Sequence, residues 1–226
     1  EDAFGISGMA AHYRDLASKM RATIRAKYWN AVKGIFADTH DHRSYSQHVN
    51  ALAVLADVVT GEEAVAVMTK TLNDPSLAQA TIYFRYYVHL ALNKAGMGDQ
   101  LLDNLQIWRD QMALGLTTWA EMPEPSRSDC HAWGASPNIE FYRILLGIDS
   151  DAPGFKKIRI APSLGSLKEV SGTMPHPAGS ISVSYKVDKK GSLSARIVLP
   201  AGTSGLFVWK GVERTLSEGI STFQIP

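Results

Sequence analysis

The chain contains 226 residues, of which 45% are hydrophobic, and carries a formal net charge of +1, which is enough apolar material for one sizeable core or two smaller ones. The balanced charge, without runs of Lys or Arg interleaved with aromatic residues, argues against a nucleic-acid partner. No apolar run is long enough to span a bilayer, and the one cysteine, Cys130, cannot form an internal disulfide. These features predict an ordinary globular protein.

The first part of the chain, up to about residue 148, has apolar residues at intervals of three and four, which predicts helices. The expected helices cover residues 46–61, 60–74, 76–96, 99–115 and 136–146. Short connections between them would make successive helices antiparallel neighbours.

Local signals refine two of these helices. Thr60 and Glu63 fit a capping box at the start of the second helix, and Ser136 with Pro137 fits the N-cap and first position of the last one. The expected buried stripes are Val49, Leu52, Ala53, Ala56 and Val59; Val65, Met68 and Leu72; and Leu101, Leu105, Trp108 and Met112.

From about Pro153 onward apolar and polar residues alternate, which predicts strands. The segment GSISVSYKVDKKGSLSARIVLP, residues 179–200, predicts a β-hairpin that turns at DKKG. FKKIRIAP, SGLFVWKG and STFQIP add further short strands, so we expect an antiparallel β-sandwich. The boundary between the two parts falls in GIDSDAPG, which predicts an α+β, multidomain fold with domains over residues 1–150 and 151–226.

One loop is unusually rich in functional side chains. The stretch TTWAEMPEPSRSDCHAWGASPN, residues 117–138, contains Trp119, Glu121, His131 and Trp133 between two predicted helices. Tryptophans can stack on the apolar face of a sugar ring, a glutamate can act as acid or base, and a histidine can hydrogen-bond a hydroxyl. Any one of these residues alone would more often be structural, but four together favour a binding or catalytic loop.

Two other groups of polar residues carry weaker signals. The stretch DTHDHRSYSQH contains Asp38, His40, Asp41, His42 and His48, whose side chains are of the kinds that bind divalent metals, but their spacing fits no strand or single helix face, so no metal site is predicted. Arg85 in YFRYY is either a cation on a helix surface or, with its flanking tyrosines, part of a polar cleft.

A set of linked segments resembles a known family. LGLTTWAE, SDCHAWGASPN, a helix ending in LLGI, PGFKKIRIAPSLG and PAGSISVSY look like the C-terminal portion of bacterial α-L-rhamnosidases of glycoside hydrolase family 78, as do YSQHVNALAV and YFRYYVHLALNKAG. The resemblance implies part of an (α/α)6 barrel followed by a β-sandwich. It also implies inverting hydrolysis of terminal α-L-rhamnosides, with no metal or organic cofactor.

The resemblance assigns roles to individual residues. Glu121 matches the general base that follows a Thr-Thr-aromatic stretch, although Ala120 separates it from Trp119 where the family more often has the tryptophan directly before the glutamate. His131 matches a sugar-contacting histidine, and Trp119 and Trp133 would line the sugar. Tyr45 and Arg85, in the resembling helical segments, are also expected to contact substrate.

The general acid has no counterpart here, because residues 1–37 contain no acidic, arginine-containing motif of the expected kind, and the helical segments number about half of those in a complete barrel. We therefore expect a fragment of a larger enzyme, whose partners are its own remainder and a rhamnose-containing oligosaccharide, polysaccharide or glycoside, without nucleic acid or a membrane span. The chain begins at Glu1 without a signal-peptide pattern, and for a bacterial polysaccharide-degrading enzyme a periplasmic or secreted location is expected over a cytoplasmic one.

Two alternatives stay open at this stage. One is a hydrolase of another sugar on the same helical barrel, because the sequence pattern does not choose the sugar. The other is a non-catalytic carbohydrate-binding or structural module, in which Trp209 of the LFVWKG strand would form an aromatic platform.

Overall fold

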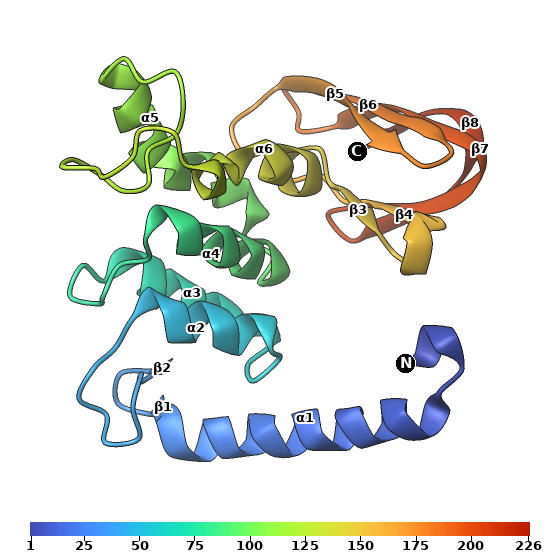
Figure 1. Cartoon of the computed structure of the whole chain (residues 1–226). Coiled ribbons are helices and arrows are strands. Elements are labelled where there is room, and N and C mark those ends of the chain that lie inside the picture. Colours follow the sequence, from blue (N-terminus) through green and yellow to red (C-terminus); the bar gives the residue numbers. More distant parts are fainter. The chain divides into compact units, whose positions relative to one another are not determined.

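The computed structural model describes residues 1–226 and combines helices with a β-sheet (Figure 1). The α-helices are α1 (Ser7–Tyr28), α2 (Gln47–Leu55), α3 (Gly61–Asn73), α4 (Ile82–Lys94), α5 (Gln106–Ala113) and α6 (Pro137–Glu140), which continues as a π-helical turn over Phe141–Leu145. The strands are β1 (Trp29–Asn30), β2 (Ile35–Phe36), β3 (Ile148–Ser150), β4 (Lys157–Ile160), β5 (Glu169–His176), β6 (Gly179–Val187), β7 (Leu193–Trp209) and β8 (Val212–Ile225). The predicted α+β composition is confirmed.

The chain divides into two compact units. The first comprises Glu1–Met97 and Leu105–Gly134, and the second comprises Gly98–Asn104 and Ala135–Pro226. The sheet of β3 to β8 thus belongs to the second unit together with α6. The domain boundary at 150/151 stays a prediction.

The core of the first unit lies between α2, α3 and α4. Its largest fully buried side chains are Phe36 of β2, Met68 of α3 and Leu92 of α4. Gly96, in the left-handed region with φ 76°, ends α4, and the amide of Met97 donates to the carbonyl of Leu92 across the turn. The predicted helical pattern is therefore present in this unit.

Several local predictions about the helices are wrong. Thr60 is the N-cap of α3 as predicted, but its side chain makes no capping bond. The Glu63 carboxylate accepts two hydrogen bonds from Arg25 of α1, at 2.8 and 2.6 Å, so the predicted capping box does not form. Ser136 has helical dihedral angles and does not cap α6, since a 3-10 turn over Ala132–Ala135 runs straight into it.

The predicted buried stripes are also only partly correct. Leu52 is 47% exposed and Met112 is 63% exposed. In α2 the predicted Ala53 is buried, and Ala51, which was not predicted, is buried as well. Apolar residues at helical spacing occupy more than one face of α2, and packing on α4 selects the face with small side chains.

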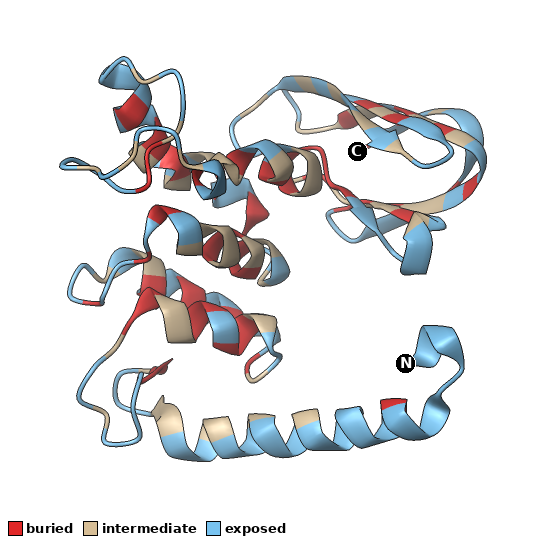
Figure 2. Cartoon of the chain, in the orientation of Figure 1, coloured by how far each residue is buried: buried red, intermediate tan, exposed pale blue.

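The helix α1 was not predicted and has little buried surface. Only Ala10 is buried among its residues (Figure 2). Its C-terminal end joins the core through Ile24 and Tyr28, and the Arg25 guanidinium lies 4.2 Å from the ring centroid of Trp29. Toward the N-terminus the helix exposes an apolar stripe: Ile6, just before the helix, Met9, Tyr13, Leu16 and Met20.

The second unit contains a six-stranded sheet in the order β3-β4-β7-β6-β5, with β8 also paired to β7. The hairpin of β6 and β7 is confirmed, and Asp188 organises its turn by accepting from the amides of Lys190 and Ser192. The strand pairs are antiparallel except β4 with β7, which is parallel, so the expectation of a wholly antiparallel arrangement is wrong.

The strand β7 is much longer than predicted. Its first part, Ser194–Val198, lies between β6 and β8, and its last part, Ser204–Phe207, lies between β4 and β8. The register shifts between Leu199 and Ser204, a β-bulge that bends the strand from one set of neighbours to the other. SGLFVWKG and STFQIP are thus the ends of two long paired strands, not separate short ones.

The sheet encloses a core of aliphatic and aromatic side chains. Tyr185 is fully buried, its hydroxyl donates to the carbonyl of Leu146 at 2.9 Å, and burial raises the pKa of this phenol. Gly147 has φ 73°, and a Cβ there would lie 2.2 Å from the carbonyl carbon of Ala161, so only glycine fits this junction. Trp209 is 7% exposed and belongs to the same core, which removes it as a sugar-binding platform.

Candidate active site

The candidate site lies in the first unit, where the segments that lead into α2 and α4 run side by side. Ser46 and Ala78 form a parallel β-bridge. Next to it the amide of Gln47 donates to the carbonyl of Ala78 at 3.0 Å, and the amide of Ala80 donates to the Gln47 side chain at 2.9 Å. The N-terminal ends of both helices are thereby fixed next to each other.

The loop between α5 and α6 reaches the first turn of α4. The rings of Trp133 and Tyr83 have centroids 5.2 Å apart, and Gly134 lies so close to α4 that a Cβ on it would be 3.6 Å from Ile82. The loop that the sequence predicts to carry functional side chains therefore lies at the N-terminal end of α4. The bridge between Ser46 and Ala78 fixes this end next to the N-terminal end of α2.

Hydrogen bonds fold this loop back on itself, so that residues 118–121 pair with residues 128–131. We call these paired segments and their connection the arch. The amide of Glu121 donates to the carbonyl of Ser128 at 2.9 Å, and the amide of His131 donates to the carbonyl of Trp119 at 2.7 Å. The Thr118 hydroxyl adds a bond to the carbonyl of Asp129. Glu121, His131 and Trp119, which are up to twelve positions apart in sequence, are brought together by these bonds.

Two buried side chains of the helix α5 hold the arch in place. The Trp108 indole donates to the carbonyl of Gly134 at 2.6 Å, and the Gln111 side-chain oxygen accepts from the amide of Ala120 at 3.0 Å. Both residues are 3% exposed. Because these positions are three residues apart, they lie on one face of α5 and hold both sides of the loop.

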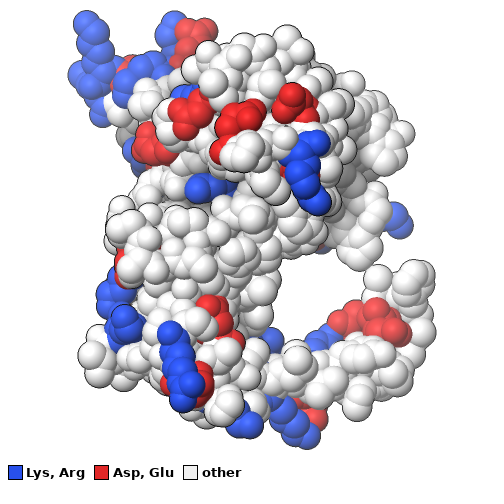
Figure 3. Space-filling view, turned by 60° about the vertical axis from the view of Figure 1, so that its left-hand side comes forward, with Lys and Arg blue, Asp and Glu red and all other residues white.

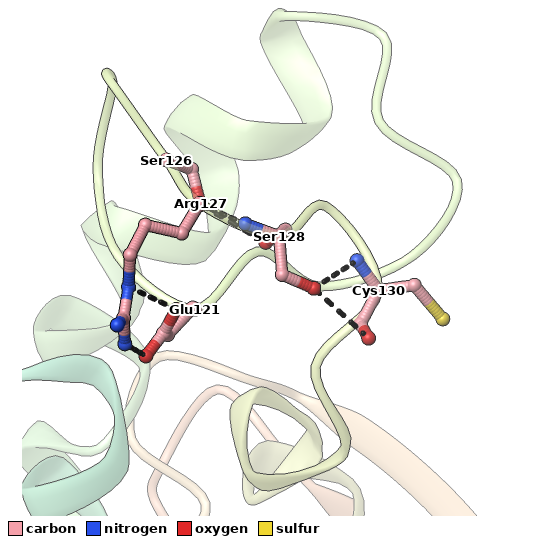
Figure 4. A network of polar contacts seen from close by, with 5 residues as sticks. All are labelled: Glu121, Ser126, Arg127, Ser128 and Cys130. Atoms are coloured by element: carbon pink, nitrogen blue, oxygen red, sulfur yellow. Dashed lines mark hydrogen bonds and ion pairs between the residues drawn. The ribbon is translucent and has the colours of Figure 1, made fainter.

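Glu121 is the buried carboxylate of the loop. It is 8% exposed and forms an ion pair with Arg127, whose Nε lies 3.1 Å from Oε2 while its Nη2 contacts Oε1 (Figure 4). The hydrogen bond and charge of Glu121 raise the pKa of Arg127. A carboxylate in this setting has a fixed orientation and a charged partner, whereas Glu124, three residues later, is exposed.

The aromatic residues continue away from the arch. The His131 and Trp133 rings are 4.2 Å apart at an interplanar angle of 46°, and Tyr83 follows beyond Trp133. Trp133 is 44% exposed and Tyr83 is 46% exposed. Aromatic surface of this kind is accessible for stacking on an apolar ligand face.

Tyr45 and Arg85, the other two predicted site residues, have different surroundings. The Tyr45 hydroxyl accepts from the Asn30 side chain at 2.7 Å, and Lys33 lies 4.8 Å from its ring centroid. The Nε of Arg85 is buried without a hydrogen-bond partner, and burial lowers the pKa of its guanidinium. The Arg85 guanidinium is therefore partly buried and does not lie freely on the helix surface. Tyr45 packs on the β1–β2 hairpin.

The histidine-rich segment before α2 is held by ordinary local contacts. The Nε2 of His42 lies 3.0 Å from the carbonyl of Lys27, Asp38 accepts from Ser46, and Asp41 accepts from Thr39. The hydrogen bond from Thr39 lowers the pKa of Asp41. No group of three or more His, Cys, Asp or Glu side chains in residues 1–226 is arranged to hold a metal ion.

Two residues near the site were not predicted from the sequence, Gln111 and Arg127, and Tyr83 was expected only as one of the tyrosines that flank Arg85. A glutamine within an amphipathic helix and an arginine in a loop look like solvent-exposed residues in a sequence. Only the pairing of 119–121 with 128–131 could have indicated that Arg127 lies opposite Glu121.

Comparison with known proteins addresses the second unit most directly. Residues 147–219 match the family model described as the bacterial alpha-L-rhamnosidase C-terminal domain. This part of the chain is similar in sequence to that domain. A curated protein of Alteromonas sp. (strain LOR) named Alpha-L-rhamnosidase is 38% identical over 69 residues, which cover 30% of this chain and 7% of that protein.

Solved rhamnosidase structures match nearly the whole chain. The crystal structure of the GH78 family rhamnosidase of Bacillus sp. GL1 is 27% identical, with a TM-score of 0.79, and the match covers 92% of this chain and 24% of that one. The Streptomyces avermitilis α-L-rhamnosidase complexed with L-rhamnose is 16% identical with a TM-score of 0.73, covering 96% of this chain and 24% of its own. The predicted resemblance to family 78 rhamnosidases is confirmed.

The chain thus spans about a quarter of the length of these solved relatives. None of its helices is both long and apolar enough to serve as a membrane span.

On the face shown in Figure 3, Lys and Arg side chains are interspersed with Asp and Glu.

Proposed function

We propose that the whole protein hydrolyses terminal, non-reducing α-L-rhamnose residues of glycosides, oligosaccharides or polysaccharides with inversion, and that this chain supplies the general-base side of the active site. The names of the related proteins support the reaction, and the L-rhamnose in the Streptomyces structure supports the sugar. Under this proposal the helical unit is part of an (α/α)6 barrel, and the rest of that barrel lies outside these 226 residues.

The observation that carries the proposal is the setting of Glu121. Its side chain is buried in a loop that α5 fixes at both sides, and the same loop carries two tryptophans and a histidine. A catalytic base needs this combination of a fixed position and a ligand-binding surface within reach.

The chemistry requires a second carboxyl group. Inverting glycosidases place an acid and a base roughly 6.5 to 9.5 Å apart, which leaves room for a water on the far side of the sugar. Glu121 would accept a proton from that water as its oxygen attacks the anomeric carbon. The acid, which protonates the leaving oxygen, would come from outside this chain.

The aromatic side chains would bind the sugar. A pyranose face carries CH groups that pack on the accessible surface of Trp133, and the neighbouring His131 imidazole can hydrogen-bond a hydroxyl. Trp119, whose carbonyl is bonded to the amide of His131, would complete this wall.

A single substitution tests the base assignment in the complete enzyme. Glu121→Gln keeps the size and shape of the side chain but cannot accept the proton, so kcat should fall by about 10² to 10⁴. Substrate binding should be largely retained, because the group acts on the water and not on the sugar. In Glu121→Ala, added azide should partly restore turnover and give a β-configured product.

Glu124→Gln is the matched control, because Glu124 is an exposed glutamate of the same loop. It should keep wild-type kcat. Comparable activity of Glu121→Gln and wild type, or an equal loss in Glu124→Gln, would remove Glu121 from the mechanism. A panel of aryl glycosides tests the sugar: cleavage of another glycoside but not of the α-L-rhamnoside would show that the substrate assignment is wrong.

A further inference from the structure

We propose that Arg127 is a positioning residue for the general base: its guanidinium holds the Glu121 carboxylate in one orientation while using one acceptor site on each oxygen, so that a remaining site can accept from the attacking water. This inference rests on the proposed role of Glu121. It concerns a residue to which neither the resemblance nor the sequence pattern assigned a role.

The contact between the two side chains is bidentate. Arg127 donates through Nε to Oε2 at 3.1 Å and through Nη2 to Oε1. Two parallel bonds fix the plane of a carboxylate, which a single lysine ammonium could not do. An ionised carboxylate has about four lone-pair sites, and the two bonds from Arg127 use one on each oxygen.

The pair is asymmetric in exposure. The side chain of Glu121 is 8% exposed, whereas that of Arg127 is 76% exposed. A buried carboxylate without a partner loses its hydration at a large free-energy cost. Arg127 therefore supplies the opposite charge that Glu121 needs, and it does so from the solvent side of the loop, where a long side chain can be displaced or replaced.

The backbone of Arg127 is also held in place (Figure 4). Its neighbours Ser126 and Ser128 are bonded to each other, with the Ser126 hydroxyl donating to the carbonyl of Ser128 at 2.9 Å. The same carbonyl accepts from the amide of Glu121, and the Ser128 hydroxyl bonds to the carbonyl of Cys130 at 3.3 Å. Arg127 thus sits at a fixed position across the arch from Glu121, which distinguishes it from an ordinary surface ion pair.

The test uses Arg127→Ala in the complete enzyme. Loss of orientation should lower kcat by about tenfold to a hundredfold with little change in KM. Because the vacated site is open to solvent, millimolar guanidinium chloride should restore several-fold activity to this variant, whereas potassium chloride at equal ionic strength should not. Arg196→Ala, which removes an exposed arginine of β7, should keep wild-type activity with or without guanidinium.

A double substitution separates positioning from general loop stability. If Arg127 acts only through Glu121, then Glu121→Gln with Arg127→Ala should be no slower than Glu121→Gln alone. The inference is overturned by wild-type or higher kcat in Arg127→Ala, by a loss that guanidinium does not reverse, or by a further loss in the double variant. If Glu121→Gln itself keeps full activity, the base assignment fails; if only Arg127→Ala keeps it, the base assignment stands and the role of Arg127 falls.

Discussion

Gly134 is the residue on which the closest approach within the loop depends. A Cβ at this position would lie 2.7 Å from the Cβ of Trp119 and 3.2 Å from the carbonyl oxygen of Ala120. Its own carbonyl accepts the bond from the Trp108 indole. Trp119, two residues before Glu121, can therefore pack against Gly134 only because Gly134 has no side chain.

We expect Gly134→Ala to destabilise the protein by about 1 to 3 kcal/mol, the usual cost of overpacking. The contacts that would have to give way are a Cβ atom and a backbone oxygen, neither of which can move without the loop. Urea unfolding followed by circular dichroism measures this change. The control is Gly8→Ala in α1, where nothing lies within 4 Å of the added methyl group; an equal loss in both variants would contradict the packing argument.

At the scale of the element, α5 is the helix that holds the loop. It has only two buried residues, Trp108 and Gln111, and each makes a side-chain hydrogen bond to loop backbone. Its outer face carries Gln106, whose side chain bonds only within the helix, to Asp110 at 2.7 Å. The function of α5 in this structure is therefore anchoring as much as core packing.

Gln111→Leu should leave the buried amide of Ala120 without an acceptor, at a cost of about 1 to 3 kcal/mol. Amide hydrogen exchange reports this bond directly, and the Ala120 amide should exchange faster in the variant. Gln111→Glu keeps an acceptor oxygen and should retain more protection of that amide. Gln106→Leu changes an exposed glutamine of the same helix and should leave the exchange rate of Ala120 unchanged; faster exchange there would argue against a specific anchor.

At the scale of the whole molecule, α1 carries a stripe of exposed apolar side chains that no other part of the chain covers. The stripe consists of Ile6, Met9, Tyr13, Leu16 and Met20, each between 42% and 55% exposed. Apolar side chains at this spacing are the pattern of a helix face that packs on another element. Under the proposed function, the rest of the barrel would supply that element.

The 226-residue chain alone should therefore associate in a concentration-dependent way. Leu16→Glu places a charge in the middle of the stripe and should reduce that association, which multi-angle light scattering can follow. A clean monomer at high concentration would show that the stripe is not a packing surface. The same isolated chain should not turn over rhamnosides, because it lacks the proposed acid; hydrolysis that depends on Glu121 would contradict the two-sided site.

The sequence by itself determined the elements whose signals are local. Alternation of apolar residues located β6 and the first part of β7, and the helices expected over 60–74 and 76–96 correspond to α3 and α4. The linked motifs also indicated the resemblance to family 78 rhamnosidases, because the order of short segments along a chain is a property of sequence alone. The density of Trp119, Glu121, His131 and Trp133 singled out the loop for the same reason.

The tertiary structure decided the contacts that join residues far apart in the sequence. Glu63 pairs with Arg25 and does not close a capping box, α2 buries Ala51 and exposes Leu52, and β7 pairs in parallel with β4 only after its bulge. Arg127 and Gln111 became part of the candidate site in the same way, one through the pairing of the loop with itself and the other through the buried face of α5. Such contacts depend on chain segments brought together in space, where burial makes an unpaired charge or amide costly, and that cost acts only once the chain has folded.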